Sequence, residues 1–356
     1  MTTIGIQQAF ACRLLLVFSL FLLAVSTDNC ETENSTPAKS DLFRASTWTP
    51  LDAIARADLY LAAAEAGQLG EEYHHLIPLA RLIEPGEFPY GNHLIRGAKA
   101  TADIPPSTQY NIGERALLSV PSLLHKLHSE HTNDDDHPPL NIDAIEALIT
   151  TPADERSLLT ILLLREASRP SSPVMPYILT FLRSAHENIP SSWDPTSPTG
   201  ANRRAALAGL PNGPTLLHAA DELRKHIIVN YGRFVPQALE RFPQLFGVDV
   251  EGSEVYSVQR FIEIWLAVRS RSFQNGAHGV LVPLACLMNH PVEGENANVE
   301  IGVGSDNGLV LRAMRFIERG EQLTYSYGDG LTAERALLVY GFPMSVWSRL
   351  PSGKGF

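Results

Sequence analysis

The chain has 356 residues, of which 44% are hydrophobic and 19% charged, enough apolar content for one large folded domain or two ordinary ones. Its formal net charge is -11 at pH 7. This balance argues against nucleic acid as a partner, because proteins that neutralise phosphates carry a basic surface. A basic partner fits the overall charge better.

An apolar run, LLLVFSLFLLAV at 14–25, follows Arg13 near the start. The small residues Ala24 and Ser26 at its end predict a signal peptide over 1–26, which would direct the protein to the secretory pathway or to an organelle reached through it. The run is shorter than the about 20 residues of a membrane span, so no stable membrane span is expected. An uncleaved signal that anchors the chain is the alternative.

The next segments differ in periodicity. Residues 27–45 are polar and predict a linker, and an N-terminal helical segment is expected over 46–89, with its first helix beginning near Thr49 and ending by Gly67. Between 94 and 124, apolar stretches such as ALLSVPSLL alternate with turn-rich ones, which indicates short strands. Helical spacing then appears at four places, namely 141–150, 154–167, 215–229 and 256–269.

The motif HKLHSEH places His125, His128 and His131 three residues apart. Three histidines along one edge of a helix suit a metal ion, but no cysteine or defined ligand spacing supports such a site. We therefore expect a solvated polar loop here and no metal. The cysteines form no CxxC pair, and Cys30 and Cys286 are expected to be free thiols.

From residue 280 onward the sequence again favours strands. LVPLACLMNH at 281–290 predicts a buried strand that ends on Asn289 and His290. NVEIGVGSDNGLVLRAMRFI predicts a β-hairpin that turns at Asn307-Gly308, and QLTYSYG at 322–328 predicts a further strand. The order of elements indicates an α+β fold with an inserted helical lobe.

Motifs for acyl transfer, phosphate binding and zinc peptidase chemistry do not occur: there is no GxSxG, GxxxxGK[ST] or HExxH. The last third of the chain instead carries polar and aromatic residues in VRSRSF, LMNH, LTYSYGDG and LLVYGF. Each residue alone is explained by a strand end or by aromatic packing. Their order and spacing together are more specific.

These motifs resemble a SET-domain protein methyltransferase, of the branch typified by the Rubisco large-subunit lysine methyltransferase. The resemblance runs through RGAKATADIPP at 96–106, ALLSVP at 116–121, VRSRSF at 268–273, LVPLACLMNH at 281–290, GEQLTYSYG at 320–328 and LLVYGF at 337–342. It implies a SET fold of short strands over 90–345, with a large helical insert at about 125–255 and a C-terminal tail at 346–356.

The resemblance also implies an activity, the transfer of a methyl group from S-adenosyl-L-methionine to a lysine side chain of a protein substrate. The positions implied to bind the cofactor are Arg96, Gly97, Arg271, Asn289, His290, Tyr327 and Phe342. Tyr327 is also the implied catalytic residue, and the implied substrate channel is formed by Phe273, Tyr325 and Tyr340. Because a methyl group on a sulfonium is already activated, such an enzyme needs alignment and exclusion of water rather than a metal.

Three departures from the family pattern keep alternatives open. Ile95 stands where the family writes the first glycine of Gly-x-Gly, Cys286 stands where it commonly has an acid, and the chain ends at Phe356 without the helical lobe that often follows in this branch. A SET-fold protein-binding module without catalysis is therefore one alternative. A protein-histidine methyltransferase is another, but a member with that activity carries asparagine where Phe273 aligns, so lysine is favoured.

Overall fold

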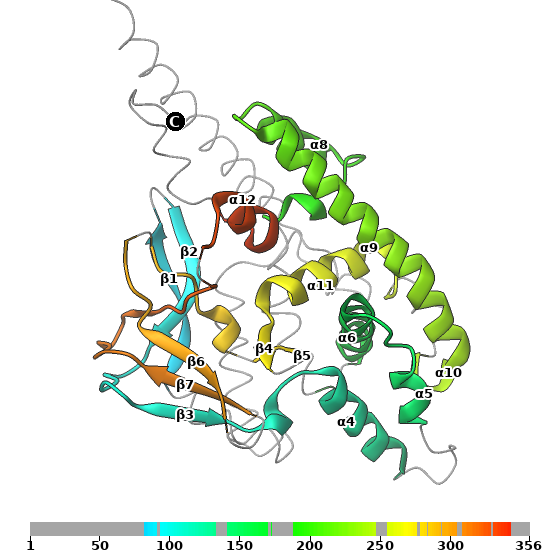
Figure 1. The fold of residues 1–356 in the computed structure, drawn as a ribbon, viewed down its shortest axis with the longest axis horizontal. Coiled ribbons are helices and arrows are strands. Elements are labelled where there is room, and N and C mark those ends of the chain that lie inside the picture. The colour runs from blue at the N-terminus through cyan, green and yellow to red at the C-terminus, as the bar shows by residue number, and fades with distance from the viewer. Residues whose placement is uncertain are drawn as a thin grey trace, which may run out of the picture.

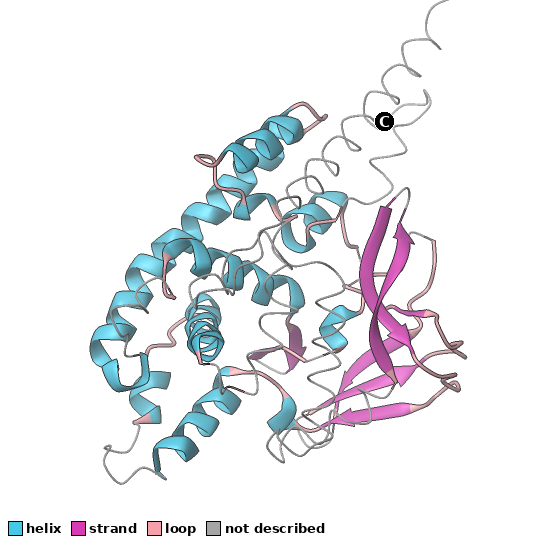
Figure 2. Ribbon diagram, turned by 180° about the vertical axis from the view of Figure 1, so that it is seen from behind, coloured by secondary structure: helices cyan, strands magenta, loops and turns pink. Residues whose placement is uncertain are grey.

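The computed structural model describes residues 82–342, except for 91–92, 133–140, 170–171, 173–187, 247–254, 276–277, 283, 293, 305–307 and 329. The expected signal peptide, the linker, the helix start near Thr49 and the tail at 346–356 lie outside the described residues. Strands gather on one side and helices on the other (Figure 1). The view from behind shows the same two lobes (Figure 2).

The strand lobe consists of three small antiparallel sheets. Their strand orders are β1-β2-β8, β3-β7-β6 and β4-β5. The strand bounds are β1 Ile83–Tyr90, β2 His93–Ala100, β3 Gln109–Ile112, β4 Phe273–Asn275, β5 His278–Val280, β6 Val299–Val303, β7 Leu309–Ala313 and β8 Gln322–Leu323. The predicted hairpin is confirmed as β6 paired with β7.

Between β3 and β4 the described elements are helical, as the sequence predicts. Their bounds are α4 Val120–Thr132, α5 Ile142–Glu146, α6 Pro152–Ser168, α8 Pro198–Ala208, α9 Gly213–Arg241, α10 Pro243–Phe246 and α11 Val258–Arg271, with 3-10 turns at Glu114–Ala116 and Pro190–Ser192. All four helices expected from periodicity are present. The third continues as α9 well beyond residue 229.

The start of α6 shows how local sequence fixes a helix boundary. The Thr151 hydroxyl accepts a hydrogen bond from the backbone N–H of Asp154, and Pro152 occupies the first turn, where its missing N–H costs nothing. The Asp154 carboxylate in turn accepts from the hydroxyl and backbone N–H of Thr150. These bonds begin the helix that passes through the centre of the helical lobe.

Several expectations about secondary structure are wrong at particular segments. ALLSVPSLL forms a 3-10 turn and then the start of α4, because Ser119 and Ser122 exchange bonds between backbone N–H and hydroxyl and so cap a helix. His125 and His128 consequently lie on α4 and not in a loop. The end of the segment 46–89 is the strand β1, beginning at Ile83.

The segment LVPLACLMNH is also not a strand. Leu281 makes an isolated bridge with Leu118, and the chain then forms a 3-10 turn at Ala285–Leu287. The segment is apolar because it is buried from several sides, and a short apolar run cannot distinguish this from a strand. Likewise QLTYSYG forms only the two-residue strand β8, and residues beyond Thr324 leave the sheet.

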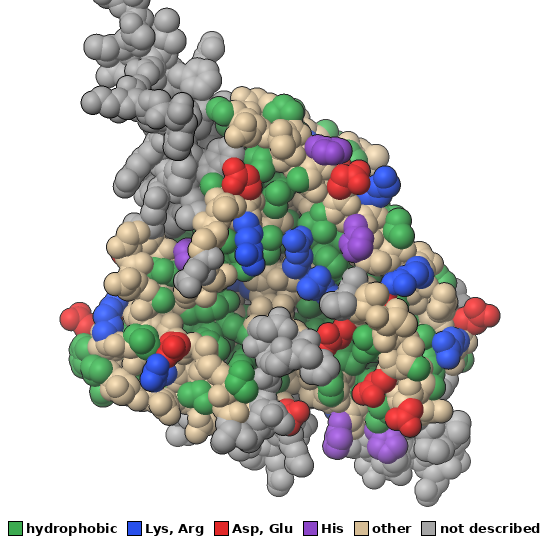
Figure 3. Space-filling model, viewed as in Figure 1, with side chains coloured by type: hydrophobic (Ala, Val, Ile, Leu, Met, Phe, Trp, Pro, Cys, Tyr) green, Lys and Arg blue, Asp and Glu red, His purple; other side chains and the backbone are tan. Residues whose placement is uncertain are grey.

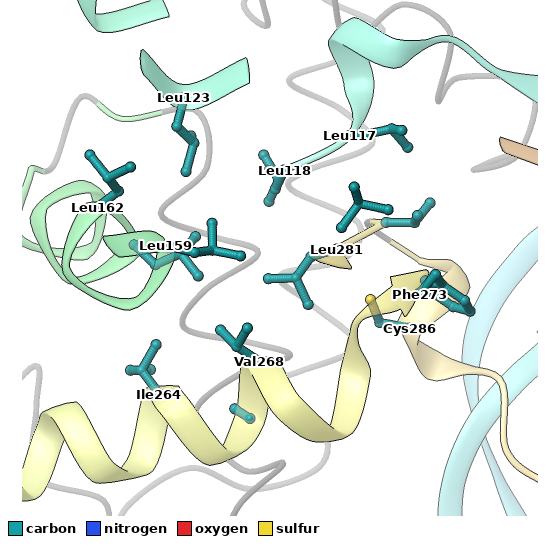
Figure 4. Close-up of a cluster of buried hydrophobic side chains, with 14 of the residues drawn as sticks. Leu117, Leu118, Leu123, Leu159, Leu162, Ile264, Val268, Phe273, Leu281 and Cys286 are labelled. Atoms are coloured by element: carbon teal, nitrogen blue, oxygen red, sulfur yellow. The ribbon is translucent and has the colours of Figure 1, made fainter. Parts of the chain in front are cut away.

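The hydrophobic core connects the two lobes (Figure 4). Buried side chains come from the loop before α4, from α6, from α11 and from the segment at 281–287; they include Leu118, Leu159, Leu162, Ile264, Val268 and Leu281. At the edge of this group Cys286 lies beside Phe273. The last described helices are α12 Ala333–Arg335 and a π-helical turn at Ala336–Tyr340.

Candidate active site

An aromatic cluster surrounds Tyr327 where the chain leaves β8. The Tyr327 ring centre lies 4.4 Å from that of Tyr340, 4.9 Å from Tyr325, 5.5 Å from His290 and 6.1 Å from Phe342. A sixth ring, Phe273, lies 5.1 Å from Tyr325. We call these six residues the aromatic cluster. The structure thus brings together the positions expected to line the substrate channel.

The cluster is assembled from segments that are distant in sequence. Asn289 forms a parallel bridge with Thr324, and its carbonyl accepts a hydrogen bond from the Tyr325 backbone N–H at 3.0 Å. This pairing sets residues 289–290 beside 324–327. Phe342 follows Gly341, whose positive φ of 76° reverses the chain after the π-helical turn. The reversal returns Phe342 towards His290, 6.4 Å away between ring centres.

Two hydrogen bonds fix Tyr327. Its hydroxyl donates to the Met288 carbonyl at 3.0 Å, and its backbone N–H donates to Nδ1 of His290 at 3.2 Å. Burial raises the pKa of Tyr327 to about 12, so the phenol is neutral at physiological pH. The Tyr327 hydroxyl donates its proton to the Met288 carbonyl, and the lone pairs of its oxygen can still accept a hydrogen bond.

His290 is neutral as well. Burial lowers its pKa from the usual 6.5, since desolvation disfavours the charged imidazole. Because Nδ1 accepts the bond from Tyr327, the ring proton of the neutral form resides on Nε2. His290 therefore offers one donor and a flat ring to a bound molecule.

A second part of the site lies at the close approach between β2 and Asn289. The Asn289 amide Nδ2 donates to the Arg96 carbonyl at 2.8 Å. A Cβ atom on Gly97 would lie 2.5 Å from the Gln322 Nε2 atom and 2.8 Å from Nδ2 of Asn289. Any side chain at position 97 would therefore force these two amide groups to move. The buried Nε2 of Gln322 has no hydrogen-bond partner, which leaves a donor available here.

Arg271, at the end of α11, contacts the segment that carries Cys286. Its guanidinium Nη1 donates to the Cys286 carbonyl at 2.7 Å, and the Cys286 thiol donates to the Arg271 carbonyl at 3.5 Å. Burial raises the pKa of Tyr327 and of Tyr325, and the positive charge of Arg271 partly opposes this rise. Arg271 therefore lies beside the aromatic cluster, as its place in the motif predicts.

The sequence-based interpretation assigned no role to Gln322, Met288 or Phe88. Gln322 was visible inside GEQLTYSYG, but nothing in the sequence shows that its amide is buried without a partner. Met288 acts through its backbone carbonyl, which leaves no signal in residue type. Phe88 packs against Gly97 from β1, and this strand lies before the expected start of the SET region.

Comparison with known proteins identifies the family. The SET domain model matches residues 96–328, so the chain belongs to the SET domain family. The match includes both the close approach at Gly97 and the catalytic candidate Tyr327. No curated protein matches the chain by sequence.

Solved structures show the same fold at low identity. The SET domain of LSMT bound to lysine and AdoHcy is similar with a TM-score of 0.57 and 16% identity, over 83% of this chain and 58% of that one. Rubisco LSMT bound to AdoMet gives 0.55 and 16%, over 83% and 57%. Rubisco LSMT bound to sinefungin and monomethyllysine gives 0.56 and 17%, over 83% and 57%. The chain thus spans less than two thirds of these structures, and the likeness establishes the α+β SET fold.

Within 82–342, gaps excluded, histidine, cysteine and acidic side chains form no group of three that suits a metal ion. No helix in the same part of the chain is both long and apolar enough to cross a bilayer. The apolar run at 14–25 lies outside the described residues.

Proposed function

We propose that the protein is an S-adenosylmethionine-dependent protein-lysine N-methyltransferase. The observation that carries this proposal is the position of Tyr327, a neutral tyrosine fixed at both its hydroxyl and its backbone, inside a cluster of aromatic rings. Membership of the SET domain family and likeness to LSMT structures bound to AdoMet and to lysine support it.

The residues at the close approach fit the cofactor. The methionine end of S-adenosylmethionine carries a carboxylate and an amino group. The Nε2 atom of Gln322, which has no hydrogen-bond partner, and the guanidinium of Arg271 beside the aromatic cluster can donate to the carboxylate, while backbone carbonyls around Gly97 can accept from the amino group. The rings of His290 and Phe342, inclined by 27° to each other, present flat surfaces and the Nε2–H donor to an adenine. The cofactor supplies a methyl group on a sulfonium.

Tyr327 would position the acceptor amine rather than ionise. With its pKa raised to about 12, Tyr327 keeps its proton, which the Met288 carbonyl binds. The phenol oxygen can then accept an N–H bond from the lysine amine and hold its lone pair towards the methyl group. The surrounding rings exclude water from that line of approach.

The aromatic cluster also favours the reactive form of lysine. An isolated lysine has a pKa of about 10.4, and an apolar channel lowers it because the charged ammonium loses hydration there. A second positive charge nearby, such as Arg271, lowers it further. The channel would therefore deliver a neutral amine without a dedicated general base.

The test has two stages with the full chain. Calorimetric titration with S-adenosylmethionine should show binding, and mass spectrometry of a lysine-containing peptide library with labelled donor should show transfer. Tyr327→Phe should keep cofactor affinity and reduce transfer about 100-fold, the effect of losing alignment. The matched control Tyr110→Phe removes a hydroxyl from β3, away from the cluster, and should change neither.

Each negative result would contradict a different part of the proposed function. Absence of cofactor binding would refute the enzyme proposal. Binding without transfer to any peptide would favour a SET-fold binding module without catalysis, and transfer to histidine would change the acceptor only. Full activity in Tyr327→Phe would show that the role given to this hydroxyl is wrong.

A further inference from the structure

The turn at 340–342, which carries two rings of the aromatic cluster, packs directly against a segment of the helical lobe. A Cβ atom on Gly341, between the two rings, would lie 3.0 Å from the carbonyl carbon of Asn188 and 3.2 Å from Cγ1 of Ile189. These distances are shorter than ordinary van der Waals contact. Asn188 and Ile189 lead into the 3-10 turn at Pro190–Ser192. The backbone at 188–189 therefore supports the turn from behind.

A small group of buried side chains holds the same turn from a second direction. We call it the second hydrophobic cluster, and it consists of Trp193, Leu207, Leu210, Leu216 and Leu337. Leu337 belongs to the π-helical turn before Gly341, and its carbonyl accepts a hydrogen bond from the Gly341 backbone N–H at 3.1 Å. Its partners in the cluster come from α8, from α9 and from the residue after the 3-10 turn. The helical lobe thus contacts the turn both at its backbone and at a side chain.

Arg224, on α9, fixes the segment that supports the turn. Its guanidinium Nη1 donates to the carbonyls of Ser191 at 3.1 Å and of Ser192 at 3.3 Å, and Nη2 donates to Oε1 of Gln259 on α11 at 3.0 Å. The hydroxyl and the backbone N–H of Ser192 both donate to the Ile189 carbonyl, at 2.8 and 2.9 Å. One guanidinium therefore joins α9 and α11 to the residues behind the turn.

The turn lies where the two lobes meet. Figures 1 and 2 show α12, which precedes it, between the strands and the α8–α9 pair. In the space-filling view the surface is hollowed between the lobes, and hydrophobic side chains gather in the hollow (Figure 3). The Tyr340 ring lies 4.4 Å from that of Tyr327. The Phe342 ring lies 6.4 Å from that of His290, so a shift of the turn would alter the proposed substrate channel and the proposed adenine site together.

We propose that Arg224 is a positioning residue for methyl transfer. By holding the segment at 188–193 against Gly341, it fixes the turn at 340–342 and with it one wall of the substrate channel and one wall of the cofactor site. The inference rests on the proposed function and gives the helical lobe a part in it. A guanidinium suits this task because its planar fork presents several N–H donors in fixed directions, so one side chain can bind two carbonyls and an amide oxygen at once.

The experiment compares Arg224→Gln with the wild-type full chain. Calorimetric titration should show the Kd for S-adenosylmethionine raised about threefold to tenfold, the usual size of an effect passed through packed neighbours. The kcat on a lysine peptide found in the library should fall about tenfold or more, because small displacements at a reacting centre cost large factors in rate. The peptide KM should change less than kcat, since peptide residues outside the channel do not contact the turn.

The conservative change Arg224→Lys should give intermediate values of Kd and kcat. A lysine ammonium can donate to one of the serine carbonyls, but it lacks the fork that also reaches Gln259. A graded series from arginine through lysine to glutamine is expected if hydrogen bonding to the segment at 188–193 places the turn.

Calorimetry also separates positioning from general instability. Loss of folded protein would reduce the number of binding sites per chain and leave the Kd of the remaining sites unchanged. Arg233→Gln is the matched control, because Arg233 lies about 14 Å further along α9 and forms an ion pair with the buried Asp154. This control should lower the free energy of unfolding without altering the Kd, or the kcat per binding site.

Leu337→Val reaches the same turn without changing Arg224. It removes one methylene group from the second hydrophobic cluster, a loss that folded proteins usually tolerate. It should change Kd and kcat in the same direction as Arg224→Gln but less strongly. In the double variant the two effects should be less than additive, because both act on one turn.

A folded Arg224→Gln variant with wild-type Kd and kcat would overturn the inference by itself, as would equal effects of Arg224→Gln and Arg233→Gln on the Kd. In both cases methyl transfer continues and the proposed function stands. If Arg224→Gln does not fold, wild-type values in Arg224→Lys and Leu337→Val would overturn the inference instead. If the wild-type chain binds the cofactor but methylates no peptide, the proposed function fails, and a Kd unchanged by Arg224→Gln would then also exclude the positioning of the turn.

Discussion

Gly97→Ala is the sharpest test of the close approach between β2 and the Asn289 segment. The added methyl group would lie 2.5 Å from the Gln322 amide nitrogen, 2.8 Å from that of Asn289 and 3.0 Å from a ring carbon of Phe88. These distances are shorter than van der Waals contact, so neighbours must move. Both amides are ends of flexible side chains and can do so without unfolding the strand.

The structure shows which interactions the Gly97→Ala change would weaken. Asn289 would give up its 2.8 Å bond to the Arg96 carbonyl, worth about 1 kcal/mol net. Crowding of Phe88 adds about 1 kcal/mol more, at the low end for overpacking. We expect the free energy of unfolding to fall by about 2 kcal/mol, and cofactor affinity to fall at least tenfold (about 1.4 kcal/mol) because both displaced amides border the proposed site.

Denaturant unfolding and calorimetric titration with S-adenosylmethionine measure the two quantities. Gly302→Ala is the control, because a Cβ atom at Gly302 on β6 meets nothing within 4 Å. It should leave stability and cofactor affinity close to the wild type. Wild-type affinity and stability in Gly97→Ala would refute the reasoning that position 97 needs glycine for space.

Three further predictions concern protonation, packing and targeting. Burial lowers the folded-state pKa of His290 below 6.5, so the unfolded chain binds more protons at this residue. His290 therefore makes the free energy of unfolding fall as pH decreases through about 6.5. His290→Gln should reduce the difference between the free energies of unfolding measured with denaturant at pH 7.5 and at pH 5.5. Asn298, 1% exposed, bonds the Gln322 carbonyl and the Thr324 backbone N–H. Asn298→Ala should lower the free energy of unfolding by about 2–4 kcal/mol and weaken cofactor binding, and unchanged denaturation would contradict this. Fusion of residues 1–40 to a reporter should yield a secreted product cleaved after 26, and a cytosolic uncleaved reporter would exclude the predicted signal peptide.

Periodicity predicted the helical elements well because their cause is local. The apolar residues of α11 recur at helical spacing and face α6 and the core, so the pattern in sequence is the pattern of burial. The β6–β7 hairpin was equally visible, because two β-prone runs flank a turn signal. In both elements, residues close in sequence determine the structure.

Segments fixed by distant contacts were predicted less well. LVPLACLMNH was expected to be a strand, yet its apolar character comes from burial among α6, α11 and the loop before α4. Periodicity cannot register such surroundings. The same is true of the site. Motif order predicted Asn289, His290 and Tyr327. The contact to the Met288 carbonyl and the unpartnered Nε2 atom of Gln322 are visible only in the three-dimensional structure.

Ile95 and Cys286, two of the three departures from the family pattern, differ in what they contact in the structure. Cys286 holds Arg271 through its backbone carbonyl, so loss of an acidic side chain at this position leaves the guanidinium anchored beside the aromatic cluster. Ile95 pairs with Phe88 across the β1–β2 ladder, and its side chain lies on the same face of β2 as Gly97, two residues further along. The close approach itself depends on Gly97, which is retained. A change in cofactor affinity is therefore to be sought at Ile95 and not at Cys286.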